Sequence, residues 1–380
     1  MRVPALDLKP QLATIRGELL NAVAKVIDST GYIMGPAVAE FEKTIADYLG
    51  VKQAIGVSSG TDALLLALMA LKVGPGDAVI TTPYSFFATA GVVARLNARI
   101  LLTDIDPDTY NMDPQKVKEL LEDLSSVERR TVKAIMPVHL YGQAADMTPL
   151  MSCADRYGIP VVEDAAQAIG ARYPLNGKAV CVGTIGKAGC FSFFPSKNLG
   201  GIGDGGLIVT NDEEYADFLR VLRVHGAKPK YCHSFIGGNF RLDTVQAAAL
   251  QVKLPHLQDW TEGRQRNAEY YDEKLASIPE VKTPKTAYRR EFHIYNQYVI
   301  SALRRDELAK YLEAREIGVN IYYPVPFHLQ PCFRNLGYGK GDFPASERAA
   351  ETTLALPIYK ELSREQLDWV VSSVREFYRS

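Results

Sequence analysis

The sequence contains few cysteines and no paired cysteine motif. The five are odd in number, scattered, and nowhere spaced as CxxC: Cys153, Cys181, Cys190, Cys232 and Cys332. This pattern argues against a disulfide framework and against a zinc knuckle, and it favours a reducing compartment. We therefore expect no metal site and a cytoplasmic location.

Long hydrophobic runs and an excess of charge of one sign are also lacking. The longest unbroken apolar stretch, residues 63–71, is far too short to cross a bilayer. The first ten residues carry Arg2, Asp7 and Lys9 and have no apolar core, so they do not resemble a signal peptide. The formal net charge is -1, which suggests neither nucleic acid nor an acidic membrane as a partner. We expect a soluble protein.

Between about residues 50 and 210 the sequence alternates short apolar runs with longer helical patterns. Several runs are apolar throughout, as in strands that are buried on both faces of a mostly parallel sheet. The alternation predicts the βαβ units of an α/β domain. The expected strands are residues 54–58, 78–82, 99–103, 133–138, 160–164, 190–194 and 207–210, and the expected helices between them are residues 61–72, 86–97, 113–124 and 146–157.

After residue 210 helical patterns dominate, with one further strand. We predict a large α/β domain over residues 1–254, including an N-terminal arm, and a smaller α+β domain over residues 255–380. Ser363 is placed to cap the last helix. The expected elements are helices at residues 212–224, 243–254, 260–276, 305–315 and 364–378, and a strand at residues 296–301.

A lysine stands in an unusual setting at residues 191–201, Phe-Ser-Phe-Phe-Pro-Ser-Lys-Asn-Leu-Gly-Gly. An aromatic strand leads into a turn, where Lys197 precedes a glycine-rich stretch. Apolar surroundings disfavour the charged form of a lysine, so its pKa falls and the neutral amine needed for Schiff-base chemistry becomes available. A solvated loop lysine is the alternative, and this segment alone leaves both interpretations open.

An acid follows a buried strand at residues 161–167, Val-Val-Glu-Asp-Ala-Ala-Gln. Asp164 lies at the C-terminal end of that strand, where open α/β sheets bind ligands. A carboxylate there can pair with a protonated pyridine nitrogen and keep the ring able to accept electrons. A helix N-cap is the alternative for Asp164. Together with Lys197, the position favours a partner for a cofactor.

A third motif, Ser-Ser-Gly-Thr-Asp-Ala-Leu at residues 58–64, leads from a strand through a turn of small residues into a helix. Free backbone N–H groups, the helix dipole and the hydroxyl groups together make an anion site. Helix capping explains the same residues, so this motif alone leaves both readings open.

Taken together, these motifs resemble the DegT/StrS family of sugar aminotransferases, which have fold-type I and depend on pyridoxal 5'-phosphate. The resemblance extends from Gly-Tyr-Ile-Met-Gly-Pro at residues 31–36 to a Tyr-Tyr-Pro segment near residue 323. It rests on six motifs in this order: Ser-Gly-Thr-Asp-Ala-Leu (59–64), Pro-Val-His-Leu-Tyr-Gly (137–142), Glu-Asp-Ala-Ala-Gln (163–167), Ser-Phe-Phe-Pro-Ser-Lys-Asn-Leu-Gly (192–200), Gly-Asp-Gly-Gly (203–206) and Asn-Phe-Arg-Leu-Asp (239–243).

The resemblance implies a role for each matching residue. Lys197 would hold the cofactor through a Schiff base and move the reacting proton, and Asp164 would hold the pyridine nitrogen. Phe86 would stack on the ring, with Phe87 as the neighbouring alternative and a core aromatic as the alternative for both. The other implied contacts are Gly60, Thr61 and Ser192 at the phosphate, Gln167 near the 3'-oxygen, and Asn239 reaching the phosphate from a second subunit. A homodimer with its active site at the interface is therefore part of the prediction.

On the substrate side, the resemblance implies a nucleotide-linked keto sugar and L-glutamate as the amino donor, in cell-surface polysaccharide or amino-sugar biosynthesis. The spacing is most similar to a subgroup that acts at C3 of UDP-linked 3-keto sugars, but some of that subgroup have a histidine where this chain has Tyr322. Packing, a structural salt bridge and a satisfied loop histidine are the alternatives for the tyrosines, the arginine and the histidine among the candidate residues. These candidates are Tyr32, Arg241, Tyr322, Tyr323 and His328.

The identity of residue 197, a lysine, also distinguishes between the possible reactions. Family members that dehydrate a sugar have a histidine at this position, so the lysine indicates transamination. A 4-keto sugar aminotransferase, a dehydratase of the same family and a non-catalytic regulator that binds pyridoxal phosphate are the alternatives. The glycines at residues 201–206 do not form a dinucleotide fingerprint, because an apolar strand follows them where that fingerprint requires a helix.

Overall fold

The apolar runs of the sequence form strands at the centre of the computed structural model, which describes residues 1–379. Four strands are hydrogen-bonded in the order β1-β9-β8-β5, and three more in the order β3-β2-β4. Two parallel bridges, Ile135 to Val161 and Val138 to Asp164, join the groups side by side. The strands are Gln53–Val57 (β1), Ala78–Thr81 (β2), Arg99–Leu102 (β3), Val132–Ile135 (β4), Val162–Asp164 (β5), Ala188–Ser192 (β8) and Gly206–Thr210 (β9).

Strand β9 is the exception to the parallel arrangement. It runs antiparallel to both β1 and β8, whereas β2 is parallel to β3 and β4, and β5 is parallel to β8. The predicted α/β class with a mostly parallel sheet is thus confirmed. Because parallel strands end at the same edge, the turns that follow β5 and β2 lie close together there.

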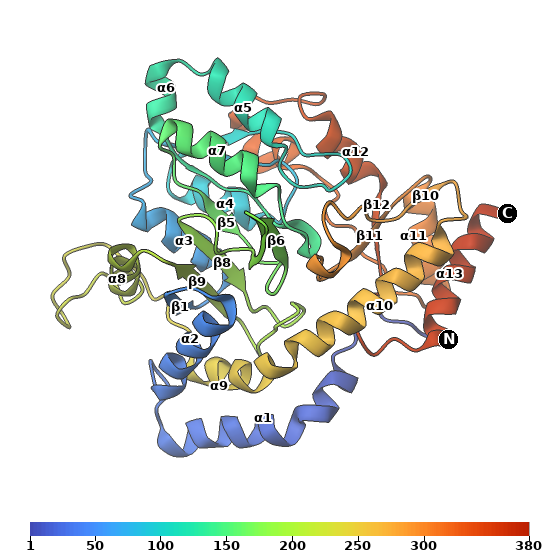
Figure 1. The fold of residues 1–380 in the computed structure, drawn as a ribbon, viewed down its shortest axis with the longest axis horizontal. Coiled ribbons are helices and arrows are strands. Elements are labelled where there is room, and N and C mark those ends of the chain that lie inside the picture. The colour runs from blue at the N-terminus through green and yellow to red at the C-terminus, as the bar shows by residue number, and fades with distance from the viewer. Residues whose placement is uncertain (380) are drawn as a thin grey trace.

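Helices cover this sheet (Figure 1). Helix α3 is apolar on nearly all sides and is buried along most of its length, as expected of a helix enclosed by other elements. It packs against β8, β9 and α8. The helices of this region are Gly60–Ala70 (α3), Ala88–Arg95 (α4), Pro114–Asp123 (α5), Ser126–Thr131 (α6), Met147–Tyr157 (α7) and Glu213–Leu222 (α8).

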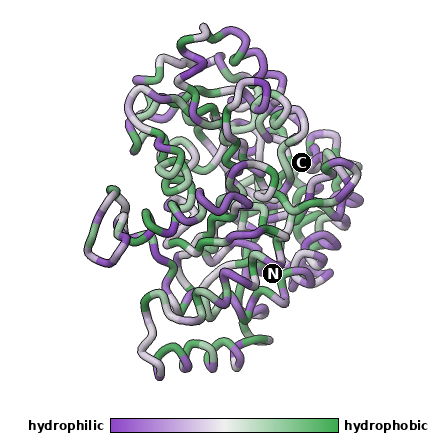
Figure 2. Tube along the Cα trace, turned by 60° about the vertical axis from the view of Figure 1, so that its left-hand side comes forward, coloured by the Kyte–Doolittle hydropathy of each residue, from purple (hydrophilic) through white to green (hydrophobic). Residues whose placement is uncertain are grey.

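The N-terminal arm expected from the sequence consists largely of two helices, Lys9–Ser29 (α1) and Pro36–Leu49 (α2), which pack against Thr244–Lys253 (α9). Helix α1 protrudes from the body (Figure 1). It carries the exposed side chains of Leu12, Leu20 and Ile27. Stretches of the helix are coloured green, for hydrophobic residues, although the helix lies at the edge of the molecule (Figure 2). One face of α1 therefore lacks an apolar partner within the described part of the chain.

The C-terminal part has a core of its own around an antiparallel sheet in the order β10-β11-β12. Val3 packs in this core and bridges Ile317, so both chain ends lie there (Figure 1). A division of the chain at residues 254 and 255 stays a prediction. The elements are Val281–Lys282 (β10), Tyr298–Ala302 (β11), Thr353–Leu356 (β12), Leu257–Leu275 (α10), Arg305–Ala314 (α11), Pro344–Thr352 (α12) and Arg364–Arg379 (α13), with a separate hairpin of Arg172–Leu175 (β6) and Lys178–Cys181 (β7).

Two local features complete the fold. The Ser363 hydroxyl accepts the N–H of Gln366 at 3.2 Å, which confirms the predicted cap of α13. None of the helices described for residues 1–379 is long and apolar enough to span a membrane.

Candidate active site

A cavity of about 430 Å³ lies where the strands of the central sheet end. Asp164 ends β5 and Ser192 ends β8, while the turn after β1 leads into α3. The fold thus places most of the predicted site residues around one space. Those that line the cavity are Gly60, Thr61, Phe86, Asp164, Gln167, Ser192, Lys197, Tyr322 and Tyr323.

Asp164 is only 3% exposed, and its carboxylate has defined donors. The Thr89 hydroxyl donates to Oδ2 at 2.8 Å, and the N–H of Ala166 donates to Oδ1 at 3.2 Å. Burial raises the pKa of Asp164, whereas these two hydrogen bonds and the charge of Lys197 lower it. Thr89 was not among the residues predicted from the sequence, although it stands in the same segment as Phe86, near the start of α4.

Lys197 lies in the turn after β8 and lines the same cavity as Asp164. Its N–H donates to the carbonyl of Phe194 at 2.8 Å, which fixes the turn. Burial lowers the pKa of Lys197 to about 8, and the charge of Asp164 opposes part of that shift. About a tenth of such amines are neutral at pH 7, far more than for an exposed lysine. The side chain can therefore act as a nucleophile.

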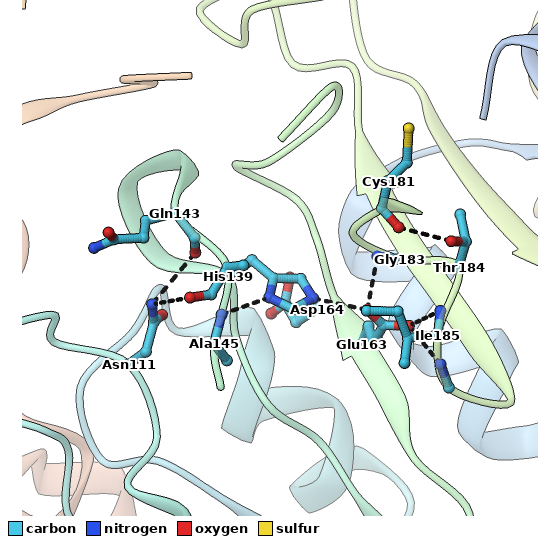
Figure 3. A network of polar contacts seen from close by, with 12 residues as sticks. Asn111, His139, Gln143, Ala145, Glu163, Asp164, Cys181, Gly183, Thr184 and Ile185 are labelled. Carbon is cyan, nitrogen blue, oxygen red and sulfur yellow. Dashed lines mark hydrogen bonds and ion pairs between the residues drawn. The ribbon is translucent and has the colours of Figure 1, made fainter. Parts of the chain in front are cut away.

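Behind Asp164 lies a buried pair of His139 and Glu163, both 0% exposed (Figure 3). The His139 Nδ1 accepts the N–H of Ala145 at 3.0 Å, so Nε2 carries the proton and donates to Glu163 at 2.9 Å. The main-chain N–H of His139 donates to the Asp164 carbonyl at 3.0 Å. Glu163 also accepts the N–H groups of Gly183, Ile185 and Gly186 at 2.7, 2.7 and 2.6 Å. This network fixes the backbone that carries Asp164.

The start of α3 offers an anion site on the cavity wall. Ser59 caps the helix by accepting the N–H of Asp62 at 3.0 Å. The N–H groups of Gly60 and Thr61 point out of the helix end, as the first N–H groups of any α-helix do. A Cβ at Gly60 would lie 2.6 Å from the Cβ of Ser192, so only glycine permits this close approach to β8. Ser192 and the helix start thereby share one wall.

The aromatic residues differ in what they contact. Phe86 is 57% exposed, and its ring centroid lies 6.2 Å from that of Tyr323 across the cavity wall. Phe87 instead stacks on Phe333 at 5.4 Å, in a separate pocket. The geometry therefore favours Phe86 over Phe87 as the ring that faces a ligand in this cavity.

Gln167 links the cavity to the tyrosines. Its Oε1 accepts the N–H of Tyr141 at 2.7 Å, and its Nε2 donates to the Tyr323 hydroxyl at 2.9 Å. The hydroxyl of Tyr84 donates to the Tyr322 carbonyl at 2.6 Å. These bonds hold the side chains of Gln167 and Tyr323 and the main chain of Tyr322 in place.

Four predicted residues lie outside the cavity of the single chain. Tyr32 is 47% exposed, Asn239 is exposed, and Arg241 is half-buried beside Val57. His328 is 2% exposed, with Nε2 at 3.0 Å from a carboxylate oxygen of Glu347. Its Nδ1 is buried and has no hydrogen-bond partner among the described residues, so only one of the two ring nitrogens is satisfied.

The residues around the cavity match the parts of pyridoxal phosphate. A lysine of lowered pKa can take up an aldehyde, and a buried carboxylate can pair with a ring nitrogen. A helix start beside Ser192 suits a phosphate, and Phe86 offers an exposed ring. The donor set therefore fits this cofactor.

The chain is similar in sequence and in structure to known proteins. The family model described as the DegT/DnrJ/EryC1/StrS aminotransferase family matches residues 13–375. A "Pleiotropic regulatory protein" of Geobacillus stearothermophilus is 49% identical over 100% of this chain and 99% of its own. A UDP-N-acetyl-3-dehydro-alpha-D-glucosamine 3-aminotransferase of Acidithiobacillus ferrooxidans is 40% identical over 98% of this chain and 97% of its own. The crystal structure of DesV of S. venezuelae, in complex with a ketimine intermediate, has a TM-score of 0.93 at 40% identity and covers 100% and 99% of the two chains.

Proposed function

The chain belongs to the DegT/DnrJ/EryC1/StrS aminotransferase family, and from this premise we propose that it transfers an amino group from L-glutamate to C3 of a nucleotide-linked 3-keto sugar. It is a sugar aminotransferase that depends on pyridoxal phosphate. The proposed reaction rests on one observation. Lys197, with a pKa of about 8, lines the same cavity as the buried Asp164. The name of the Acidithiobacillus relative, a 3-aminotransferase of a UDP-linked sugar, supports C3 and UDP.

The residues divide the work of the reaction. Bound pyridoxal phosphate supplies an aldehyde that takes up the amino group and a ring that accepts electrons from the substrate carbon. The Lys197 amine holds the cofactor and then moves a proton at the reacting carbon. Asp164 keeps the ring nitrogen protonated. The remaining contacts orient the cofactor: Gly60, Thr61 and Ser192 at the phosphate, Gln167 at the 3'-oxygen and Phe86 at the ring face.

A homodimer is the second part of the proposal. Asn239 and Tyr32 are exposed, Arg241 is half-buried, and none of the three lines the cavity of its own chain. The uncovered apolar side of α1, with Leu12 and Leu20, supports a contact with a second copy. In such a dimer Asn239 reaches the phosphate of the partner's site, and the sugar nucleotide lies between the subunits. We also infer that the enzyme acts in the cytoplasm, which the scattered free cysteines support.

One relative favours a second role. The Geobacillus stearothermophilus protein is named as regulatory, and a regulatory function of this chain is the other candidate. Because Lys197 and Asp164 are both in place, we propose that regulation would accompany catalysis and not replace it.

The test is turnover of a small panel of sugars. Purified protein with pyridoxal phosphate and L-glutamate is incubated with UDP- and dTDP-linked 3-keto and 4-keto sugars, and products are identified by mass. We expect amination of a 3-keto sugar. Amination of 4-keto sugars alone would move the reaction to C4, loss of a hydroxyl would indicate a dehydratase, and no turnover of the whole panel would favour the regulator.

Two variants test the assignment of the cavity. Lys197→Ala should abolish both the yellow colour of the holoenzyme and its turnover, since no amine remains to hold the cofactor. Asp164→Asn should lower kcat by about a hundredfold or more while changing Tm little, because shape is kept and only the counter-ion is lost. An Asp164→Asn enzyme as active as the wild type would remove the pyridinium role.

A further inference from the structure

A second cavity, of about 310 Å³, adjoins the cofactor cavity. The two cavities share the lining residues Ser196, Gln297 and Tyr322. Ser196 directly precedes Lys197 in the chain, so the second cavity begins beside the turn that carries the reactive amine. A ligand that reacts at Lys197 can therefore extend a group into it.

Arg264, on α10, lines the second cavity although it is only 6% exposed. Its Nη1 donates to three carbonyls, those of Tyr295 at 3.1 Å, Asn296 at 3.3 Å and Ile358 at 2.8 Å. Within residues 1–379, no carboxylate lies at ion-pair distance from Arg264, and its Nε and Nη2 donate no hydrogen bond. Those two nitrogens form the edge of a guanidinium that binds a carboxylate in bidentate fashion.

The charge of Arg264 is not neutralised by the cavity wall. Burial lowers its pKa to about 10, and the charge of Glu361 opposes the shift, so the guanidinium is still protonated at neutral pH. The lining contains the polar side chains of Asn296, Gln297 and Asn320, and neither Asp nor Glu is among the described residues that line it. A buried cation without a counter-ion is costly, and an anionic group in the cavity would remove that cost.

Resting on the proposed function, we propose that this cavity is the subsite for the distal carboxylate of a dicarboxylic amino donor. The amino group of the donor must lie beside Lys197, in the cofactor cavity. Arg264 lines only the neighbouring cavity, so the anion that it binds lies at the other end of the donor. The bidentate edge of Arg264 binds that carboxylate, and a donor without a second carboxylate leaves the charge unpaired.

The first test is the half-reaction of the holoenzyme with an amino acid alone, followed by the loss of the yellow absorbance. Arg264→Gln should raise the KM for L-glutamate by about tenfold or more, because the charge-assisted pair with the distal carboxylate is lost. The KM for L-alanine, which has no second carboxylate, should change by less than about twofold. Arg266→Gln, on the exposed side of the same helix, is the matched control and should change neither KM.

Two outcomes would overturn the subsite. If Arg264→Gln weakens glutamate and alanine equally, Arg264 acts only through the three carbonyls that it holds. If instead the glutamate half-reaction is unchanged and the KM for the sugar nucleotide rises, the anion in the cavity is a phosphate of the acceptor.

Because Arg264→Gln also removes the donor to three carbonyls, a second variant keeps the test independent of folding. Ala5 lines the second cavity, and Ala5→Trp should fill it while leaving Arg264 in place. The probe is glutarate, a dicarboxylate without an amine, measured by calorimetry on the holoenzyme and compared with butyrate. We expect the wild type to prefer glutarate and Ala5→Trp to lose that preference. An Ala5→Trp variant that binds glutarate as the wild type does would overturn the subsite.

Failure of this proposal can be told apart from failure of the proposed function. Glutarate binding and the half-reaction need no sugar, so a panel of sugars without turnover would overturn the proposed function and leave the subsite standing. Amination of a sugar by an Arg264→Gln enzyme with unchanged selectivity for glutamate over alanine would overturn the subsite alone.

Discussion

At the scale of single residues, the site depends on Lys197 and Asp164. Burial shifts the pKa of each side chain in the direction that favours its neutral form. Burial lowers the pKa of Lys197 to about 8 and raises the pKa of Asp164. The first shift serves the reaction, because a neutral amine is the nucleophile. The second opposes it, because the carboxylate must be charged to hold a protonated ring nitrogen. Thr89 and the N–H of Ala166 counteract that second shift.

Uptake of the cofactor should report the pKa of Lys197. The rate at which the cofactor-free protein turns yellow with pyridoxal phosphate should rise with pH through about 8 and then level off, since only the neutral amine attacks. Asp164→Asn removes the charge that raises the pKa of Lys197, so the midpoint should move to lower pH. Stopped-flow absorbance from about pH 6 to about pH 10 measures both. A wild-type rate that still climbs near the upper limit would mean that the lysine is not shifted.

Thr89 should tune Asp164. Thr89→Val keeps the shape of the side chain but removes the hydroxyl that stabilises the charged carboxylate, so the pKa of Asp164 rises further. Since the reaction needs the ionised form, the acidic limb of kcat/KM against pH should move to higher pH by about one unit. Thr89→Ser should restore it. Lys197, His139, Tyr323 and Cys190 also face Asp164 and are unchanged in both variants. An unmoved limb in Thr89→Val would assign the hydroxyl to packing alone.

At the scale of elements, the site is assembled from strand ends and a helix start. Helix α3 begins immediately after the turn that follows β1, and this turn lies close to β8 because Gly60 has no Cβ. The end of β5 is fixed from behind by His139 and Glu163. The phosphate wall and the carboxylate wall therefore belong to different elements that only the sheet brings together.

Gly60→Ala should therefore weaken cofactor binding. The added Cβ would lie 2.6 Å from that of Ser192, so the start of α3 must shift and its N–H groups lose their direction. We expect the Kd for pyridoxal phosphate to rise by about tenfold, measured by absorbance titration. Gly17→Ala is the control, because a Cβ there meets nothing within 4 Å on α1 and should slightly raise Tm. Equal affinity in the two variants would argue against a phosphate at this helix start.

At the scale of the whole molecule, the cavity of one chain lacks Asn239, which makes the proposed dimer testable. Lys197→Ala and Asn239→Ala homodimers should both be weak. After unfolding together and refolding, heterodimers carry both defects in one site and none in the other, so about a quarter of the wild-type activity should return. Mixing without refolding is the control. Activity that stays at the average of the parents would place Asn239 outside the partner's site.

The strands at the centre of the molecule and the reactive residues at their ends can be predicted without a structure. Strands without polar residues, such as residues 54–57, report burial on both faces, so their positions and the α/β class follow from the sequence pattern. Lys197 and Asp164 were predictable because Asp164 ends a buried strand and Lys197 lies in the turn after another. Helices α1 and α2 went unpredicted because the residues before about residue 50 were expected only to form an arm. Their amphipathic pattern was the signal available there.

Contacts between residues that are distant in the sequence follow from the packing of the folded chain. Thr89 contacts Asp164 although 75 positions separate the two residues in the sequence. Arg264 lines a cavity together with Ser196 and Asn320. His328, adjacent in sequence to cavity-side segments, turns toward Glu347 instead. Contacts of this kind depend on how faces of separate elements pack, and local sequence carries no record of the partner. The chemical type of each residue can therefore be read from the sequence, whereas its contacts depend on the fold.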